Sequence, residues 1–423
     1  MQSKTSTKEN YRYYTLVKMN SHKLYYLFLS LLIIATSCST NSVVKPGFIQ
    51  ENIQFAAAQE KRQVEQIEQS GKILNPRTVK DGSVKYVVPD DWTSGFYPGT
   101  MWYMFELTGD STWRTYARKY TEAIDTVKYM TWHHDVGFMV QCSFGNGLRL
   151  GEEKYKEVIL QSARSLSTRF RPVAGIIQSW NVDKGWQSER GWECPVIIDN
   201  MMNLELLFNA TKLSGDSSFY KIAVSHADKT MQNHYRPDYS CYHVVDYSLA
   251  DGSIRNKHTA QGFAHESAWA RGQAWGIYGF TMCYRETHEI KYLRQAQKAF
   301  EFVVNHKNFP IDFVPYWDFD APKIPNEPRD ASSAAILASA LYELSTYEKG
   351  EYFKGWADKI MQSLASPAFR AKLGGNGNFI LMHSVGSIPH GNEIDVPLNY
   401  ADYYFLEALK RKRDLENKTK PTN

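Results

Sequence analysis

The sequence predicts an all-α protein whose helices pair into an (α/α)6 barrel, and three observations support this fold class. A helix–turn–helix unit recurs, in which Gly and an acid form the turn and an aromatic residue follows; Gly109-Asp110 before Trp113 and Gly215-Asp216 before Tyr220 are clear examples. No strand-like alternation of apolar and polar residues extends far along the chain. Tight turns alternate with long connections, which favours a closed toroid over an open solenoid.

Each helix is predicted from apolar residues at helical spacing and from its ends, because Gly ends one helix and an acid or Ser caps the next. Twelve helices are predicted in order, at residues 53–70, 96–108, 111–128, 137–150, 152–170, 199–213, 217–233, 265–287, 289–306, 330–347, 350–366 and 397–413. Long loops carry function more often than tight turns, so one face of the barrel should hold the site. The long connections are residues 71–95, 171–198, 234–264, 307–329 and 367–396.

Composition is that of a globular protein with a full core, since 43% of the 423 residues are hydrophobic. The aromatic content of 14% is high; it suits a core, and aromatic rings also line sugar-binding clefts. The formal charge of +4 comes from residues 1–37, which carry five bases and one acid, so the remainder is about neutral. No clustered Lys/Arg run indicates nucleic-acid binding.

The N-terminal segment, residues 1–38, is interpreted as an export signal. Lys18 and Lys23 precede a short apolar run, and Ala35-Thr36-Ser37-Cys38 ends it, in the manner of a bacterial lipobox with Cys38 as the acylated residue. An ordinary cleaved signal with an incidental Cys is the alternative, and Met19 is an alternative start. The expected location is exported, as a periplasm-facing or outer-membrane lipoprotein of a Gram-negative bacterium.

The domain boundaries follow from this signal. Residues 39–50 are predicted as a linker, 51–413 as a single catalytic domain and 414–423 as a flexible tail. The four remaining cysteines lie far apart without Cys/His ligand spacing, so they are expected to be buried free thiols. Neither a metal site nor a cofactor is predicted.

Two acids are the candidate catalytic groups. Asp199 begins a helix with apolar residues behind it, and Asp135 follows Trp132-His133-His134. A carboxyl group in such an apolar setting loses hydration, so the pKa of Asp199 is expected to rise toward a value useful for donating a proton. The alternative role of Asp199 is a helix N-cap.

A second dense stretch contains Arg271 and Trp275, which are four residues apart and share one helix face. A guanidinium beside an indole suits an anionic sugar, although a structural Arg in the barrel core is an equal alternative. His243, His258 and Gln261 lie upstream, where a lone His is more often structural than catalytic.

Taken together, these segments resemble the unsaturated glucuronyl hydrolases of glycoside hydrolase family 88, over about residues 50 to 410. The segments that carry the resemblance occur in order as Asp91–Gly99, His134–Phe138, Asp199–Leu204, Trp269–Trp275 and Asn399–Glu407. The family has the (α/α)6 barrel fold. The resemblance implies a hydrolase that removes a 4,5-unsaturated uronic acid from the non-reducing end of lyase-generated oligosaccharides by acid-catalysed hydration of the C4=C5 bond.

The resemblance also implies residue roles. Asp199 matches the general acid/base and Asp135 the second essential acid. The implied substrate-binding residues are Trp92, Trp186, His243, Gln261, Arg271, Trp275, Ser384 and Ser387, with His258 a weaker match than His243. Some members that prefer sulfated fragments have Ser-x-x-Ser-x-Lys, whereas this chain has Pro389 in place of the Lys. The lost cation argues against a strict sulfate preference unless a nearby Arg or Lys supplies the charge.

Two alternatives stay open from the sequence. One is an unsaturated rhamnogalacturonyl hydrolase of the neighbouring family, which has the same barrel. The other is a lipid-anchored glycan-binding protein without catalysis. The expected partners are an unsaturated uronyl oligosaccharide, such as a glycosaminoglycan or ulvan fragment, and the membrane through the lipid anchor only, with no nucleic acid.

Overall fold

The computed structural model describes residues 47–419, so the predicted export signal with Cys38 and part of the predicted linker and tail lie outside the described residues. Its α-helices match the predicted helices in number and order when α5 and α6 are counted as one. They are α2 (Phe48–Gln69), α3 (Phe96–Thr108), α4 (Ser111–Glu122), α5 (Val136–Val140), α6 (Asn146–Arg149), α7 (Lys156–Ser167), α8 (Leu204–Ser214), α9 (Ser217–Asn233), α10 (Ala270–Thr287), α11 (Ile290–Asn305), α12 (Ala331–Leu344), α13 (Gly350–Leu364) and α14 (Asn399–Thr419). The short α5 and α6 together form one predicted helix.

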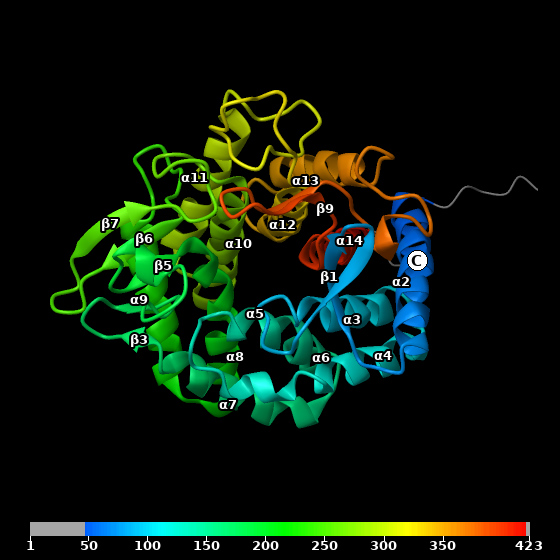
Figure 1. The fold of residues 1–423 in the computed structure, drawn as a ribbon, viewed down its shortest axis with the longest axis horizontal. Coiled ribbons are helices and arrows are strands. Elements are labelled where there is room, and N and C mark those ends of the chain that lie inside the picture. The colour runs from blue at the N-terminus through cyan, green and yellow to red at the C-terminus, as the bar shows by residue number, and fades with distance from the viewer. Residues whose placement is uncertain (1–46, 420–423) are drawn as a thin grey trace, which may run out of the picture. The chain divides into compact units, whose positions relative to one another are not determined.

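The inner helices close into a ring (Figure 1). Contacts run from α3 through the α5–α6 segment to α8, then to α10, α12 and α14, and from α14 back to α3. The outer helices pack on this ring, with α4 on α3, α7 on α8, α11 on α10 and α13 on α12. This arrangement confirms the predicted (α/α)6 barrel for the described part of the chain.

The tight turns have the predicted chemistry at two hairpins. Gly109 and Gly215 take left-handed backbone angles (φ 73° and 77°) that an L-residue adopts only with strain. Asp110 and Asp216 then cap the following helices by accepting hydrogen bonds from backbone N–H groups two residues on.

Several boundaries differ from the prediction. The helix α2 begins at Phe48, inside the predicted linker, and α14 continues to Thr419, inside the predicted tail. The helix predicted at 265–287 begins only at Ala270, because Trp269 still has extended backbone angles. A π-helical turn at Gln141–Gly145 divides the helix predicted at 137–150.

Short strands are the main feature that the sequence analysis missed. They form three two-stranded sheets and one three-stranded antiparallel sheet in the described chain, β5-β6-β7. The strands are β1 (Asn75–Lys80), β2 (Ser83–Val87), β3 (Phe170–Arg171), β4 (Ile176–Ile177), β5 (Pro195–Ile197), β6 (Val244–Tyr247), β7 (Ile254–His258), β8 (Ser384–Ser387) and β9 (Asn392–Val396). All lie in the long connections except Phe170, the first residue of β3, and strands of two to six residues leave too little alternation to detect.

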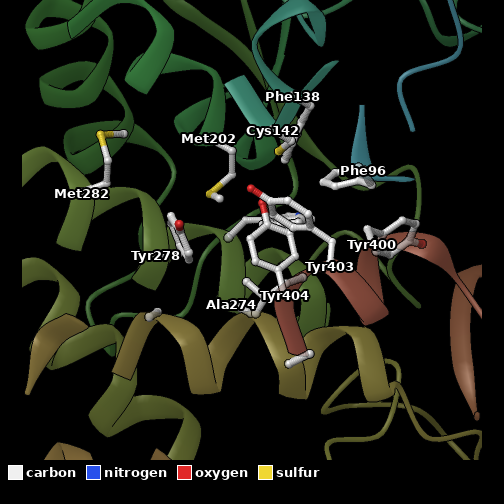
Figure 2. Close-up of a cluster of buried hydrophobic side chains, with 14 of the residues drawn as sticks. Phe96, Phe138, Cys142, Met202, Ala274, Tyr278, Met282, Tyr400, Tyr403 and Tyr404 are labelled. Atoms are coloured by element: carbon white, nitrogen blue, oxygen red, sulfur yellow. The ribbon is translucent and has the colours of Figure 1, made fainter. Parts of the chain in front are cut away.

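The core inside the ring is aromatic (Figure 2). Phe96, Tyr403 and Tyr404 form a cluster with ring centroids 4.9–6.0 Å apart, at the edge-on or tilted angles that aromatic pairs prefer. The four cysteines of the described chain are buried and free, as predicted. Among residues 47–419, no helix is both long and apolar enough to cross a membrane.

Candidate active site

A cavity of about 130 Å³ lies at the barrel end that carries the long connections. Four of the five long connections contribute to its lining, and the connection at residues 307–329 does not. Six residues expected at the site from the sequence line this cavity: Trp92, Asp135, Asp199, Gln261, Arg271 and Ser387. The long-loop face therefore holds the candidate site, as predicted.

Asp199 lies in a 3₁₀ turn, Ile198–Asn203, that leads into α8. The N-cap of this turn is Ile197 and that of α8 is Asn203, so the N-cap alternative for Asp199 is wrong. Burial raises the pKa of Asp199 to about 7, and the positive charge of Arg271 opposes part of the rise. Its buried Oδ2 has no hydrogen-bond partner in the described chain. The group is a carboxylic acid that can donate a proton near neutral pH, as the sequence predicted.

Asp135 precedes α5 and lies between two histidines. Its Oδ2 is 3.3 Å from His133 Nδ1, and its Oδ1 is 3.3 Å from His134 Nε2. Burial acts to raise its pKa, but His134 and His133 more than offset this, so the pKa of Asp135 lies below its ordinary value. Between the lowered pKa of Asp135 and about pH 7, Asp135 is ionised while Asp199 is mostly protonated, and the charge of Asp135 contributes to the raised pKa of Asp199.

Direct contact between their backbone segments fixes the two acids relative to each other. The Phe138 N–H donates to Asn203 Oδ1 at 2.8 Å, and Asn203 Nδ2 lies 3.2 Å from His134 Nδ1. Gly137 allows this approach, because a Cβ there would stand 2.4 Å from Asn203 Oδ1. The Asn203 amide therefore ties the Asp135 helix to the turn that carries Asp199.

His243 is held as a neutral donor. Its Nδ1 accepts from the backbone N–H groups of Ala260 and Gln261 at 3.0 and 3.2 Å, so the ring proton belongs on Nε2. That Nε2 lies 3.7 Å from Asp199 Oδ2. Burial lowers the pKa of His243 well below its ordinary value, so the ring stays uncharged. His243 lies behind the lining, next to Asp199, whereas His258 accepts from Trp192 Nε1; neither ring lines the cavity.

Arg271 is buried, has a structural role and also lines the cavity. It pairs with the Asp330 carboxylate at 3.2 Å and donates to the carbonyl oxygens of Val385 and Gly386. Its buried Nε has no partner in the described chain. Most of its donors thus hold β8 against the barrel, and Nε is the donor left without a partner in the described chain.

The tryptophans are placed only partly as predicted. Trp92 packs on Phe138 and Tyr400 at the cavity wall. Trp275 is fully buried and does not line the cavity, and its indole N–H acts to lower the pKa of Asp199. Trp186 does not line the cavity. It packs edge-on against Trp180, with centroids 5.0 Å apart, and Trp180 lines the cavity in its place.

The serine hairpin β8–β9 forms another wall. Ser387 lines the cavity and its Oγ lies 2.7 Å from His390 Nδ1. Ser384 is buried outside the lining, and its hydroxyl has no partner among the described residues. Burial, and to a smaller extent the charge of Arg190, lowers the pKa of His390. A cation therefore lies near this loop, although Pro389 replaces the Lys.

The remaining lining residues come from the unpredicted strands and the last inner helix. Arg77 on β1 donates to Glu393 on β9 and to Asp91, which joins the two hairpins beside the cavity. The lining residues that the sequence analysis missed are Arg77, Trp180, Ile197, Gly386, Asn392, Glu393 and Tyr400. A local sequence signal existed only for Tyr400, which lies in the Asn399–Glu407 segment; the others depend on strand pairing across distant loops.

A larger outer groove of about 600 Å³ opens from this cavity. The two share Trp92, Asp135 and Trp180 as a common rim. In the described residues, no group of three or more His, Cys, Asp and Glu side chains is arranged to hold a metal ion. The site as built offers a protonated acid, an ionised acid, a neutral His and aromatic walls.

Comparisons with known proteins agree with this chemistry. Residues 65–309 match the family model described as Glycosyl Hydrolase Family 88. The chain is 50% identical over 335 residues to an unsaturated glucuronyl hydrolase of Formosa agariphila, covering 78% of this chain and 82% of that protein. It is similar to the crystal structure of an unsaturated glucuronyl hydrolase specific for heparin, with 43% identity, TM-score 0.83, and 87% and 98% of the two chains covered. It also resembles a solved variant of such an enzyme with the tetrasaccharide dGlcA-Glc-Rha-Glc, at 30% identity, TM-score 0.78, and 86% and 96% covered.

Proposed function

The chain belongs to glycoside hydrolase family 88, and on that premise we propose that it removes a 4,5-unsaturated uronic acid from the non-reducing end of oligosaccharides. The observation that carries the proposal is the pair of acids in one cavity with opposite protonation states. Asp199, with a pKa raised to about 7, supplies the proton, and Asp135, with a lowered pKa, supplies a negative charge beside it.

The reaction is a hydration of the C4=C5 vinyl ether. The Asp199 carboxyl transfers its proton to C4, and the positive charge that develops at C5 is shared with the ring oxygen. Water adds to C5 and returns a proton to the Asp199 carboxylate, which gives a hemiketal. The hemiketal opens by breaking the C5–O5 bond, and the resulting hemiacetal at C1 releases the leaving sugar. One water is consumed, and Asp199 ends protonated as it began.

The other groups serve binding and charge. The ionised Asp135 stabilises the cationic character at C5, since opposite charges attract strongly in a cavity that excludes bulk water. The Nε2–H of His243 and the free Nε of Arg271 are donors for the uronate's oxygens. Trp92 and Trp180 provide aromatic walls for the sugar ring.

The direct test follows the ultraviolet absorbance of the C4=C5 bond when the protein without residues 1–38 meets a panel of unsaturated uronyl disaccharides. Loss of absorbance, which Asp199→Asn prevents, is the expected result. Binding without turnover would instead support the glycan-binding alternative. Turnover of only an unsaturated rhamnogalacturonan disaccharide would support the neighbouring family.

The pH dependence of kcat/KM follows from the two pKa shifts. Asp199 must be protonated, so activity falls as the pH rises through about 7. Asp135 must be ionised, so activity is retained on the acid side until the pH falls through its lowered pKa, below the ordinary value of 3.8. A profile measured with the disaccharide from pH 4 to 9 should therefore show an acid plateau and an alkaline decline with its midpoint near pH 7. An activity that increases above pH 7 would contradict the assignment of Asp199 as the acid.

We also propose that the enzyme is exported and tethered by lipid at Cys38, with residues 1–38 as its signal. The support is the small-residue sequence before Cys38 and the polar residues after it. Expressed with its signal in a Gram-negative host, the wild-type protein should be in the membrane fraction and Cys38→Ser in the soluble fraction. Ser39→Ala is the matched control and should stay with the membranes. A wild-type protein found in the soluble fraction would contradict the anchor.

A further inference from the structure

The outer groove is continuous with the cavity that holds Asp199. The common rim of Trp92, Asp135 and Trp180 separates an inner volume of about 130 Å³ from an outer volume of about 600 Å³. If the unsaturated ring occupies the inner cavity, as the proposed function requires, the rest of an oligosaccharide leaves past this rim. The groove is several times larger than the inner cavity, so it can hold more than the first leaving unit.

Trp132 lines this groove and is unusual for an indole, because 49% of its surface is exposed. Its indole N–H makes no hydrogen bond within residues 47–419, and its one aromatic neighbour there is His133, edge-on with centroids 6.3 Å apart. No hydrogen bond therefore accounts for the side chain, and about half of it stays open to the groove. An aromatic ring with a free face and a free N–H is suited to stack on a sugar ring.

The backbone beneath Trp132 is held firmly. The buried Arg169 donates to the Thr131 carbonyl at 2.6 Å, and the His134 N–H donates to the Ser179 carbonyl at 3.1 Å. His133 and Trp180 form an antiparallel bridge, which joins the Trp132 segment to the rim of the inner cavity. The platform is thus fixed in place before a ligand arrives, which lowers the entropic cost of binding.

The charges in the groove favour an uncharged occupant. Asp90 and Asp183 are exposed carboxylates on its walls, Asp135 is ionised at its inner end, and Lys184 is the lining Lys. The fourth carboxylate, Asp91, is paired with Arg77. A sulfated or uronate unit would meet more like charge than opposite charge here, whereas a neutral pyranose would not.

We propose that the outer groove binds a neutral pyranose beyond the first leaving unit and that Trp132 is its stacking platform. The inference rests on the proposed function and assigns to this site a preference for unsaturated oligosaccharides longer than disaccharides. Trp132 touches no reacting atom, so it acts through substrate affinity.

The test compares kcat/KM for the unsaturated tetrasaccharide dGlcA-Glc-Rha-Glc with that for dGlcA-Glc, in the wild-type protein and in variants. Wild type should favour the tetrasaccharide through a lower KM. In Trp132→Ala, the KM for the tetrasaccharide should rise about three- to tenfold, while kcat and the kcat/KM for the disaccharide stay unchanged. Trp132→Phe should retain most of the wild-type advantage, because the ring face remains. Tyr129→Ala is the matched control, since Tyr129 is an exposed aromatic three residues away that does not line the groove.

The outcomes separate the two proposals. Equal kcat/KM for the two substrates in wild type, or an equal loss on both in Trp132→Ala, overturns the groove assignment while leaving the proposed function standing. No hydrolysis of either substrate, nor of any member of the disaccharide panel, overturns the proposed function and this inference with it.

Discussion

Asp199→Asn should lower kcat on an unsaturated uronyl disaccharide by about 10²–10⁴-fold, the contribution typical of a general acid. The amide has the same shape as the carboxylic acid but cannot deliver a proton to C4. Because Oδ2 of Asp199 has no partner in the described chain, the substitution breaks no hydrogen bond of that atom. The measurement is the rate of absorbance loss under saturating substrate, with KM determined beside it.

Folding should survive this change. The folded-state pKa of Asp199 is raised, so its ionisation disfavours the folded state, and its contribution to stability declines as the pH rises from about 3.8 toward 7. Asn removes that cost, and the melting temperature of Asp199→Asn at pH 8 should equal or exceed that of the wild type. A marked fall in melting temperature would mean that the lost activity reflects unfolding.

Asp402 supplies the matched comparison. Burial also raises its pKa to about 7, but it lies outside the cavity and accepts the backbone N–H groups of Ile380 and Leu381. Asp402→Asn turns an acceptor into a donor facing an N–H, so it should lower the melting temperature while folded molecules keep their kcat. An equal loss of kcat in both variants would show that the assay reports stability and not acid catalysis.

Asp135→Asn should lower kcat by about 10²–10³-fold, because it removes the charge that stabilises the cationic C5. A second effect is specific to this geometry. The charge of Asp135 contributes to raising the pKa of Asp199, so removing it should move the alkaline decline of activity to lower pH. A full pH profile of Asp135→Asn checks this.

The shift in the profile distinguishes coupling from simple damage. A variant that is merely misfolded loses activity equally at every pH and keeps the midpoint near 7. His133→Ala is a milder control, since it removes one neighbour of Asp135 and leaves His134 in place. It should raise the pKa of Asp135 and narrow the acid side of the plateau without moving the alkaline midpoint. An unmoved alkaline midpoint in Asp135→Asn would mean that the two acids are not coupled.

The sequence by itself determined the barrel and its two acids. Helix periodicity and the Gly–acid turns are local signals, read within a few residues, so Gly109-Asp110 and Gly215-Asp216 mark real helix ends. The raised pKa of Asp199 was also predictable, because it stands in an apolar stretch whose members Ile198 and Met201 are themselves buried.

The tertiary structure alone decided how the site is enclosed. Arg77, Trp180 and Glu393 reach the cavity because short strands pair between loops that lie far apart in the chain, and such strands leave no periodic signal. The same holds for Arg271, for which the sequence left a substrate-binding and a structural role equally open; β8 and Asp330 occupy most of its donors. Local pattern fixes which residues form an element, whereas the partners of a side chain depend on contacts between distant segments.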